Sequence, residues 1–314
     1  MPEVVIVGAA ITDLQIYPVR KSVIDVASYP AEKMIWTVGG DALNEATIIT
    51  RMGHDVRLIS SIGNDAAAQI ILSHCKANHI STEYLKLDEN KTTAINIGLI
   101  WEDGERTFIN NKSGSLWTFS PDDIDIDSVS EGKILSFASI FNSPNLDEGF
   151  MISLFERAKE NHMLICADMV APKKGETLHD VENALKYIDY FFPNYDEGKN
   201  LTGHEDPEEI AEVLLKLGVK NVILKIGKRG CLVKNSCDEF IVPSYSGANC
   251  IDTTGAGDNF ASGFISGLLE GKNIRECAVM ANCAASLAIE AVGATNGLTS
   301  REKFNERLSR YTPV

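Results

Sequence analysis

Short apolar runs along the chain alternate with longer segments in which apolar residues recur at helical spacing. The apolar runs lie at residues 4–7, 56–59, 134–137, 163–167 and 222–226. Helical spacing occurs at residues 41–52, 66–77, 146–160, 207–217, 258–269 and 274–291. Continuous apolar runs are typical of strands buried on both faces. The alternation therefore predicts an α/β fold with a mostly parallel sheet covered by helices on both sides.

Two segments depart from this alternation. Residues 14–38 are mixed and strand-like, and within residues 92–112 the pair Asp103-Gly104 separates two further strand-like runs. Asp-Gly between such runs predicts a β-hairpin. We therefore expect one domain over residues 1–314, in which insertions at about 14–38 and 92–112 form a small β-sheet lid.

The charge balance limits the partners. The chain has 29 Lys and Arg against 44 Asp and Glu, a net charge of −15. Binding to nucleic acid depends on clustered cations, so we expect no nucleic-acid partner. A small anion would have to be held by backbone N–H groups, a helix N-terminus or a divalent cation.

The remaining composition indicates a cytoplasmic protein. The seven cysteines are odd in number and never spaced C-x-x-C, as expected of reduced thiols. The N-terminus lacks a basic region, and no apolar stretch approaches the roughly 18 residues that span a bilayer. The chain has neither H-E-x-x-H nor G-x-S-x-G, so zinc and serine hydrolases have no support.

The most informative segment runs from Asp252 to Asp258, Asp-Thr-Thr-Gly-Ala-Gly-Asp, directly before a predicted helix. Its small residues Gly255, Ala256 and Gly257 leave backbone N–H groups able to face an anion at the helix N-terminus. Asp258 alone could be a capping carboxylate, but Asp252 and the glycine spacing make that explanation incomplete. The segment matches neither the Walker A loop nor the dinucleotide fingerprint.

Together with Gly39-Gly40-x-x-x-Asn44, this segment resembles the two signatures of the ribokinase-like (PfkB) carbohydrate kinase family, in the same order and at a similar separation. The resemblance extends to residues 103–107, Asn194-x-x-Glu197 and Gly227-x-x-Gly230. It implies a ribokinase-like three-layer α/β/α fold. It also implies ATP-dependent transfer of a phosphoryl group to a hydroxyl of a small carbohydrate.

The resemblance implies roles for residues at the reaction centre. Asp258 would be the general base for the acceptor hydroxyl, and the N–H groups of Gly255, Ala256 and Gly257 would form an anion hole. The residues expected to bind the acceptor are Asp13, Gly39, Gly40, Asp41, Asn44 and Asn142. Ribokinases carry Lys at the place of Asp41 and Glu at that of Asn142, so ribose is not the expected acceptor.

On the nucleotide side, the family pattern places magnesium at Asn194 and Glu197. The alternative for this pair is a helix N-cap with Glu at the third position. Lys225, Gly227 and Gly230 would bind the triphosphate. Asn282 would lie beside the adenine. A monovalent cation, usually potassium, would be held by Asp252 and by carbonyl groups of Thr254, Ala288, Ala291, Gly293 and Gly297.

Other functions remain open on the sequence. Tyr17, Tyr29, Trp36 and Trp101 in or near the lid keep a nucleoside kinase possible. A sugar sensor without turnover is a further alternative, although sensing alone would not require a base. A dehydrogenase is disfavoured because the first strand lacks its fingerprint. In the family such lids close over the sugar and pair between subunits, which implies a homodimer.

Overall fold

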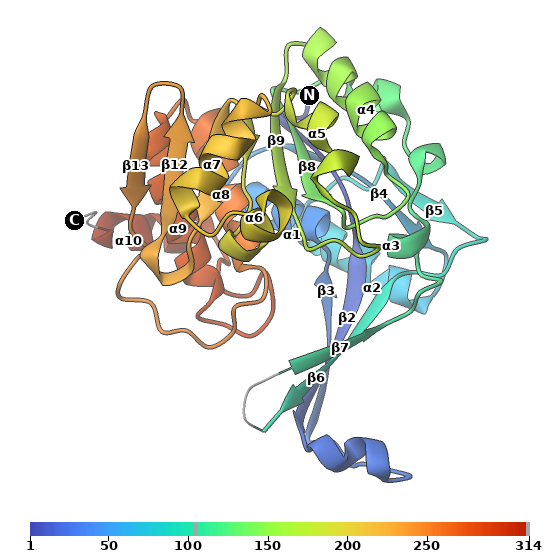
Figure 1. Ribbon diagram of the computed structural model, residues 1–314. Coiled ribbons are helices and arrows are strands. Elements are labelled where there is room, and N and C mark those ends of the chain that lie inside the picture. The colour runs from blue at the N-terminus through green and yellow to red at the C-terminus, as the bar shows by residue number, and fades with distance from the viewer. Residues whose placement is uncertain (103–105, 312–314) are drawn as a thin grey trace.

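The computed structural model describes residues 1–102 and 106–311, and its larger sheet confirms the expected parallel α/β architecture (Figure 1). This sheet has nine strands in the order β13-β12-β11-β10-β9-β8-β1-β4-β5. The strands are β1 (Val4–Val7), β4 (Val56–Gly63), β5 (Leu85–Asp88), β8 (Ile134–Ile140), β9 (Leu164–Met169), β10 (Tyr190–Phe191), β11 (Asn221–Lys225), β12 (Cys231–Asn235) and β13 (Glu239–Val242). All pair in parallel except β12 and β13, which extend one edge antiparallel.

Helices cover both faces of this sheet. They are α1 (Asp41–Arg51), α2 (Ala66–Ala77), α3 (Ser115–Thr118), α4 (Glu148–Glu160), α5 (Glu182–Leu185), α6 (Tyr195–Thr202), α7 (Pro207–Lys216), α8 (Ala256–Leu269), α9 (Ile274–Ala288) and α10 (Arg301–Arg310). Short 3-10 turns are η1 (Lys21–Asp25), η2 (Pro121–Asp123), η3 (Ile126–Ser130), η4 (Leu178–Asp180) and η5 (Gly227–Arg229).

Alternate residues of β1 separate the two hydrophobic cores. Val5 and Val7 belong to the core under α4, α5, α6 and α7, whereas Val4 and Ile6 belong to the core under α1, α2, α8 and α9. All four side chains are fully buried. Because successive strand residues point to opposite faces, this division shows a three-layer α/β/α sandwich.

The predicted elements differ from the observed ones mainly at their ends. Helix α8 begins at Ala256, two residues before the expected start, and α9 ends at Ala288 instead of residue 291. Strands β5, β10 and β13 and helices α3, α5 and α10 were not expected. Among the described residues, none of the helices is both long and apolar enough to cross a membrane.

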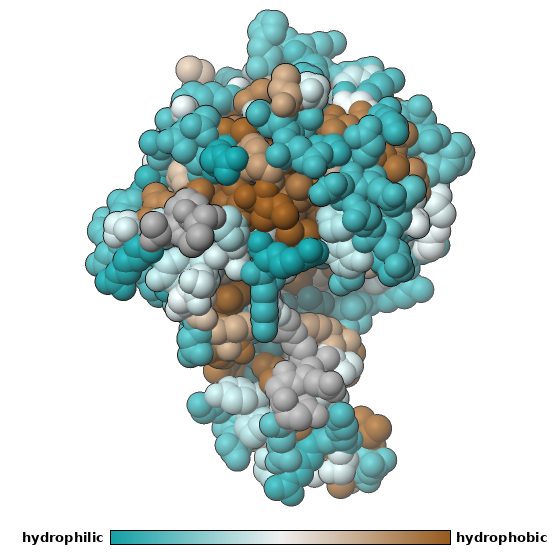
Figure 2. Space-filling view, turned by 60° about the vertical axis from the view of Figure 1, so that its left-hand side comes forward, coloured by the Kyte–Doolittle hydropathy of each residue, from teal (hydrophilic) through white to brown (hydrophobic). Residues whose placement is uncertain are grey.

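The two irregular segments form a second sheet, the lid sheet, in the order β3-β2-β6-β7. Its strands are β2 (Ile11–Val19), β3 (Lys33–Gly39), β6 (Ile95–Trp101) and β7 (Arg106–Asn110). Strands β6 and β7 pair antiparallel, with Ile97 opposite Ile109, while the Asp103-Gly104 turn lies outside the described residues. The lid sheet forms a narrow lobe that projects from the main body (Figure 2).

Candidate active site

A cavity of about 330 Å³ lies between the carboxyl edge of the large sheet and the lid sheet. Its polar lining includes the six expected acceptor residues together with Thr254, Gly255 and Asp258. It also includes four polar residues that sequence reasoning missed, Asn96, Asn110, Ser139 and Lys173. The fold therefore brings both family signatures to one pocket, although they are separated by more than 200 positions along the chain.

Asp258 lies in the first turn of α8 and faces this cavity. Its Oδ2 accepts a 2.7 Å hydrogen bond from Nδ2 of Asn44 on α1. Burial, and then the negative charge of Asp41, raise the pKa of Asp258 to about 7, although the bond from Asn44 acts in the opposite direction. A carboxyl group with a pKa near 7 is well matched to accepting a proton at neutral pH.

The turn before α8 depends on glycine. Gly255 has a φ of 72°, and a Cβ there would lie 2.5 Å from the Cβ of Ala294, so both conformation and space exclude a side chain. The Ala256 N–H donates to the Thr253 carbonyl at 3.2 Å, a bond with which an anion would compete. At Gly257 an added Cβ would lie 3.3 Å from Nζ of Lys225, so a cation lies beside the helix N-terminus.

Two buried side chains of the pocket have oxygens without hydrogen-bond partners. These atoms are Oδ1 of Asp13 and Oδ1 of Asn44. Burial raises the pKa of Asp13 to about 6, while the hydrogen bond from Asn96 opposes this shift. An acceptor oxygen left unsatisfied costs free energy, so both atoms favour a ligand that donates hydrogen bonds, such as a polyol.

Gly39 and Gly40 allow the chain to pass close to this pocket. A Cβ at Gly39 would lie 2.3 Å from Oδ2 of Asp13. Gly40 has a φ of 89°, and its Cβ would lie 2.5 Å from the Ala9 carbonyl oxygen. Both positions therefore require glycine for reasons of space, and Gly40 also for its backbone conformation.

Asp41 is hydrogen-bonded to Asn142, which is in turn hydrogen-bonded to Lys173, so the three side chains form a chain of hydrogen bonds in the pocket. Its Oδ1 accepts from the N–H groups of Ala9 (2.9 Å) and Ala42 (2.8 Å), and its Oδ2 accepts from Nδ2 of Asn142. Nζ of Lys173 donates to the carbonyl oxygen (2.7 Å) and Oδ1 (2.5 Å) of Asn142. Both oxygens of Asp41 thus have protein partners, and this residue orients Asn142.

A buried ion pair lies beside Gly257 at the start of α8. Nζ of Lys225 contacts Oδ1 (2.8 Å) and Oδ2 (2.6 Å) of Asp168, which lies in β9. Burial opposes the charge of Lys225, but Asp168 and Glu197 outweigh it and raise the pKa of Lys225. The ammonium group is therefore held in its charged form beside Gly257, where it can attract a phosphoryl group.

Asn194 and Glu197 form the helix cap that was the alternative to magnesium binding. Oδ1 of Asn194 accepts from the Glu197 N–H (2.9 Å), and Oε2 of Glu197 accepts from the Asn194 N–H (2.7 Å). Burial raises the pKa of Glu197 to about 7, with Lys225 acting in the opposite direction. The cap uses one oxygen of each side chain and leaves Oε1 of Glu197 for a cation or its bound water. Among the described residues, no cluster of three or more His, Cys, Asp and Glu residues is suited to hold a metal.

Gly227 and Gly230 lie in the turn between β11 and β12. Gly230 has a φ of 96°, and a Cβ there would lie 2.0 Å from the Val242 carbonyl oxygen. The same carbonyl accepts a 3.1 Å bond from Nδ2 of Asn282. Asn282 is buried and is hydrogen-bonded to the end of β13, so its amide has a structural partner at the place expected beside the adenine.

Asp252 ties the signature loop to the segment after α9. Its Oδ1 accepts from the N–H (2.9 Å) and Oγ1 (2.7 Å) of Thr254, and its Oδ2 accepts from the Gly293 N–H (2.9 Å). Gly297 packs against the same helix, since a Cβ there would lie 2.0 Å from the Leu287 carbonyl oxygen. The structure thus brings the expected cation-binding region together, with Ala288 ending α9 and Ala291 following it.

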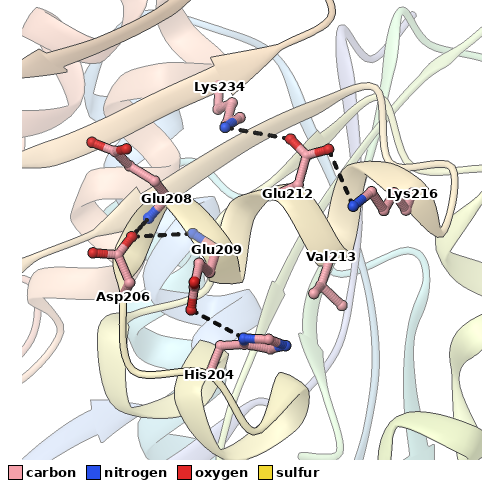
Figure 3. A pocket seen from close by; sticks show the side chains of 8 residues that line it. All are labelled: His204, Asp206, Glu208, Glu209, Glu212, Val213, Lys216 and Lys234. Carbon is pink, nitrogen blue, oxygen red and sulfur yellow. Dashed lines mark hydrogen bonds and ion pairs between the residues drawn. The ribbon is translucent and has the colours of Figure 1, made fainter.

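A larger hollow of about 510 Å³ lies on the outer surface of α7 (Figure 3). Several of the charged groups that line it pair with one another. Glu212 contacts Lys216 and Lys234, and Glu209 contacts His204. This hollow lies apart from both signatures, and none of the described side chains that line it has a buried polar atom without a hydrogen-bond partner, unlike the pocket at Asp258.

The fold is an α/β sandwich whose polar cavity lies between the lid sheet and the N-terminus of α8. The chain belongs to the pfkB family of carbohydrate kinases, whose profile matches residues 1–301. It is an ATP-dependent carbohydrate kinase, as the resemblance implied.

Similar proteins support this assignment. The chain is 31% identical over 250 residues to an uncharacterized sugar kinase of Archaeoglobus fulgidus, covering 80% of this chain and 97% of that protein. It is 27% identical to a 2-dehydro-3-deoxygluconokinase of Bacillus subtilis over 88% of each chain. The crystal structure of a ribokinase from Thermotoga maritima matches with a TM-score of 0.85 at 26% identity, covering 98% of this chain and 100% of that one.

Proposed function

We propose that this kinase transfers the γ-phosphoryl group of ATP to a hydroxyl of a small polyhydroxylated acceptor bound between Asp13, Asn44 and Asp258. The observation that carries the proposal is the position of Asp258. Its carboxylate faces the acceptor cavity, is oriented by Asn44, and has its pKa raised to about 7. Asp258 would accept the hydroxyl proton as the oxygen attacks the phosphorus.

The developing charge would be stabilised from the start of α8. The N–H groups of Gly255, Ala256 and Gly257 would face the phosphoryl oxygens, and the helix dipole acts in the same sense. Lys225 lies beside Gly257 and would attract the same group. Gly227 and Gly230 would let the backbone approach the nucleotide phosphates, and Asn282 lies behind this turn.

Asn194 and Glu197 would hold Mg²⁺ through bound water, since that ion usually keeps several waters and takes few protein ligands. The metal would neutralise charge on the triphosphate. Asp252 and the carbonyl groups of Thr254, Ala288, Ala291, Gly293 and Gly297 would hold a monovalent cation such as potassium.

The lid sheet would close the acceptor cavity as part of a single domain. Asp13, Asn96 and Asn110, which line the cavity, stand in register across β2, β6 and β7. They would contact the acceptor and exclude water, which prevents hydrolysis of ATP. Phe108 is the one aromatic side chain among the described residues that line the cavity, so the lining adds no support for a nucleoside.

The test is a coupled assay of Mg·ATP consumption with sugars, polyols, sugar acids and nucleosides, with and without potassium. Asp258→Asn keeps the shape of the side chain but removes the base, so we expect kcat to fall about 10²- to 10⁴-fold. The variant should still bind ATP and unfold at the wild-type temperature. A variant with near-normal kcat would contradict the assignment of Asp258.

A further inference from the structure

The acceptor cavity contains a lysine that lacks a carboxylate partner. Lys173 lies in the irregular segment after β9, is half-buried, and lines the cavity. Other lysines that are partly or fully buried contact a carboxylate directly, among them Lys91, Lys159, Lys225 and Lys234. None of the ion pairs formed within residues 1–102 and 106–311 includes Lys173. A half-buried ammonium without an anion is costly in free energy, so we expect the charge of Lys173 to have a function.

The protein groups around Lys173 are neutral at contact distance. Its two hydrogen bonds go to the carbonyl and the side-chain amide oxygen of Asn142. The ring of Trp117 lies 5.4 Å from Nζ. An ammonium has three N–H donors, so one remains for a ligand.

Asp41 cannot provide the missing anion. Its two oxygens already accept from Ala9, Ala42 and Asn142, and it acts on Lys173 only at longer range, as does Glu176. Burial lowers the pKa of Lys173 against these two charges. A ligand anion in the cavity would supply the direct partner that the protein does not.

We propose, building on the kinase function above, that Lys173 determines acceptor specificity by binding a carboxylate, so that the substrates of this enzyme are polyhydroxy acids. The hydroxyl end of such a molecule would donate to the unsatisfied Oδ1 atoms of Asp13 and Asn44. Its carboxylate would accept from Lys173. Asn142, fixed by Asp41, would hold the ammonium in place between these two ends.

A carboxylate fits the charges of the cavity better than a phosphate. Asp13, Asp41 and Asp258 all line the cavity, and each repels an anion. One remaining N–H suits a single negative charge, whereas a phosphate monoester brings close to two at neutral pH. Phosphorylated sugars are therefore the class of anionic acceptor that the cavity should reject.

The experiment measures kcat/KM for aldonic acids of four to six carbons, each paired with its alditol, and for fructose 6-phosphate. We expect the wild-type enzyme to prefer each acid to its alditol by more than about tenfold, in keeping with a hydrogen bond to a charged group. Lys173→Met should lower kcat/KM for the acids about 10- to 100-fold, mainly through KM. The alditols should change by less than about threefold.

Two further variants separate charge from structure. Lys173→Arg should retain part of the preference for acids, because it keeps the charge. Lys174→Met is the matched control, since Lys174 is exposed next to Lys173 and should leave all rates unchanged. Melting temperatures, and their shifts with gluconate and with glucitol in the absence of ATP, report folding and acceptor binding independently of turnover.

The outcomes distinguish the two proposals. Equal losses for acids and alditols in Lys173→Met would show that Lys173 only positions Asn142, and would overturn the carboxylate assignment. Wild-type turnover confined to uncharged acceptors or to fructose 6-phosphate would also overturn it, while leaving the kinase function intact. Absence of turnover with every acceptor in the wider panel, by enzyme that still binds ATP, would count against the proposed function itself.

Discussion

The protonation of Asp258 is set by a few identifiable neighbours. Burial and Asp41 raise its pKa to about 7, and the hydrogen bond from Asn44 lowers it. Because the base must be ionised to accept a proton, we expect kcat/KM of the wild-type enzyme to fall as the pH decreases through about 7. A profile that stays flat down to pH 5 would contradict this assignment.

Asn44→Ala tests the cause of that pKa. Loss of the hydrogen bond removes an interaction that favours the ionised carboxylate. The pKa of Asp258 should therefore rise, and the acidic limb of the profile, the fall of kcat/KM at low pH, should move to higher pH. The rate above the limb should also fall about tenfold, because one hydrogen bond to the acceptor is lost. The measurement is kcat/KM from pH 5 to 9 for both enzymes. An unchanged limb would show that Asn44 does not control the charge of Asp258.

For individual residues, the sequence predicted which side chains lie in one site but not the hydrogen bonds between them. Asp13, Asn44 and Asp258 were expected in one site and line one cavity. The role of Asp41 in orienting Asn142 could not be predicted from the sequence. It depends on a hydrogen bond between the two side chains, and Asn142 follows a different strand. Lys173 carries no motif, and only its place after a strand whose carboxyl end faces the site could have pointed to it.

The turn between β11 and β12 contains two glycines that should differ in the cost of substitution. Gly227 and Gly230 both have positive φ, but an added Cβ meets nothing within 4 Å at Gly227 and the Val242 carbonyl oxygen at 2.0 Å at Gly230. Gly227→Ala should cost about 1–2 kcal/mol of stability from backbone strain alone. Gly230→Ala should cost clearly more, because β13 must also move.

If this turn contacts the triphosphate, Gly230→Ala should also raise the KM for ATP by more than Gly227→Ala does. Thermal unfolding and initial rates at varied ATP give the two quantities for each variant. Equal effects of the two substitutions on both quantities would show that the close approach of β13 has no part in nucleotide binding.

The elements predicted best were those with a continuous apolar run or a long helical pattern. The run at residues 4–7 became the fully buried β1, and the helix expected at residues 66–77 occurs at Ala66–Ala77. Strand β10 has only two residues, and β5 alternates Leu with Lys and Asp and is partly exposed, so neither has a continuous apolar run. The Asn194 cap shows a different limit, because the same two side chains can cap a helix and face a cation.

The lid sheet turns a polar row of side chains toward the rest of the molecule and an apolar row away from it. The row Asp13, Asn96 and Asn110 faces the cavity. The adjacent row, Trp36, Leu14, Ile97 and Ile109, stands in register on the opposite face. Alternation along each strand therefore directs apolar residues away from the protein's own core. The sequence predicted a second sheet, but the pairing of four strands was needed to show this face.

That outward face carries the last prediction, the homodimer. Trp36 is 51% exposed and Ile109 is 54% exposed, and both lie on the outer strands of the lid sheet. Contiguous exposed apolar residues mark an interaction surface, and burying them in a second copy would cover both lids at once.

We expect the wild-type protein to sediment as a dimer at micromolar concentration, and Trp36→Glu and Ile109→Glu to sediment as monomers. Because a lid without its partner would close less firmly, the KM for the acceptor should rise in both variants. Ile241→Glu on β13, where Ile241 is likewise 51% exposed, should change neither property. A monomeric wild-type protein with full activity, or dimers that survive both lid substitutions, would show that the apolar face of the lid does not join two subunits.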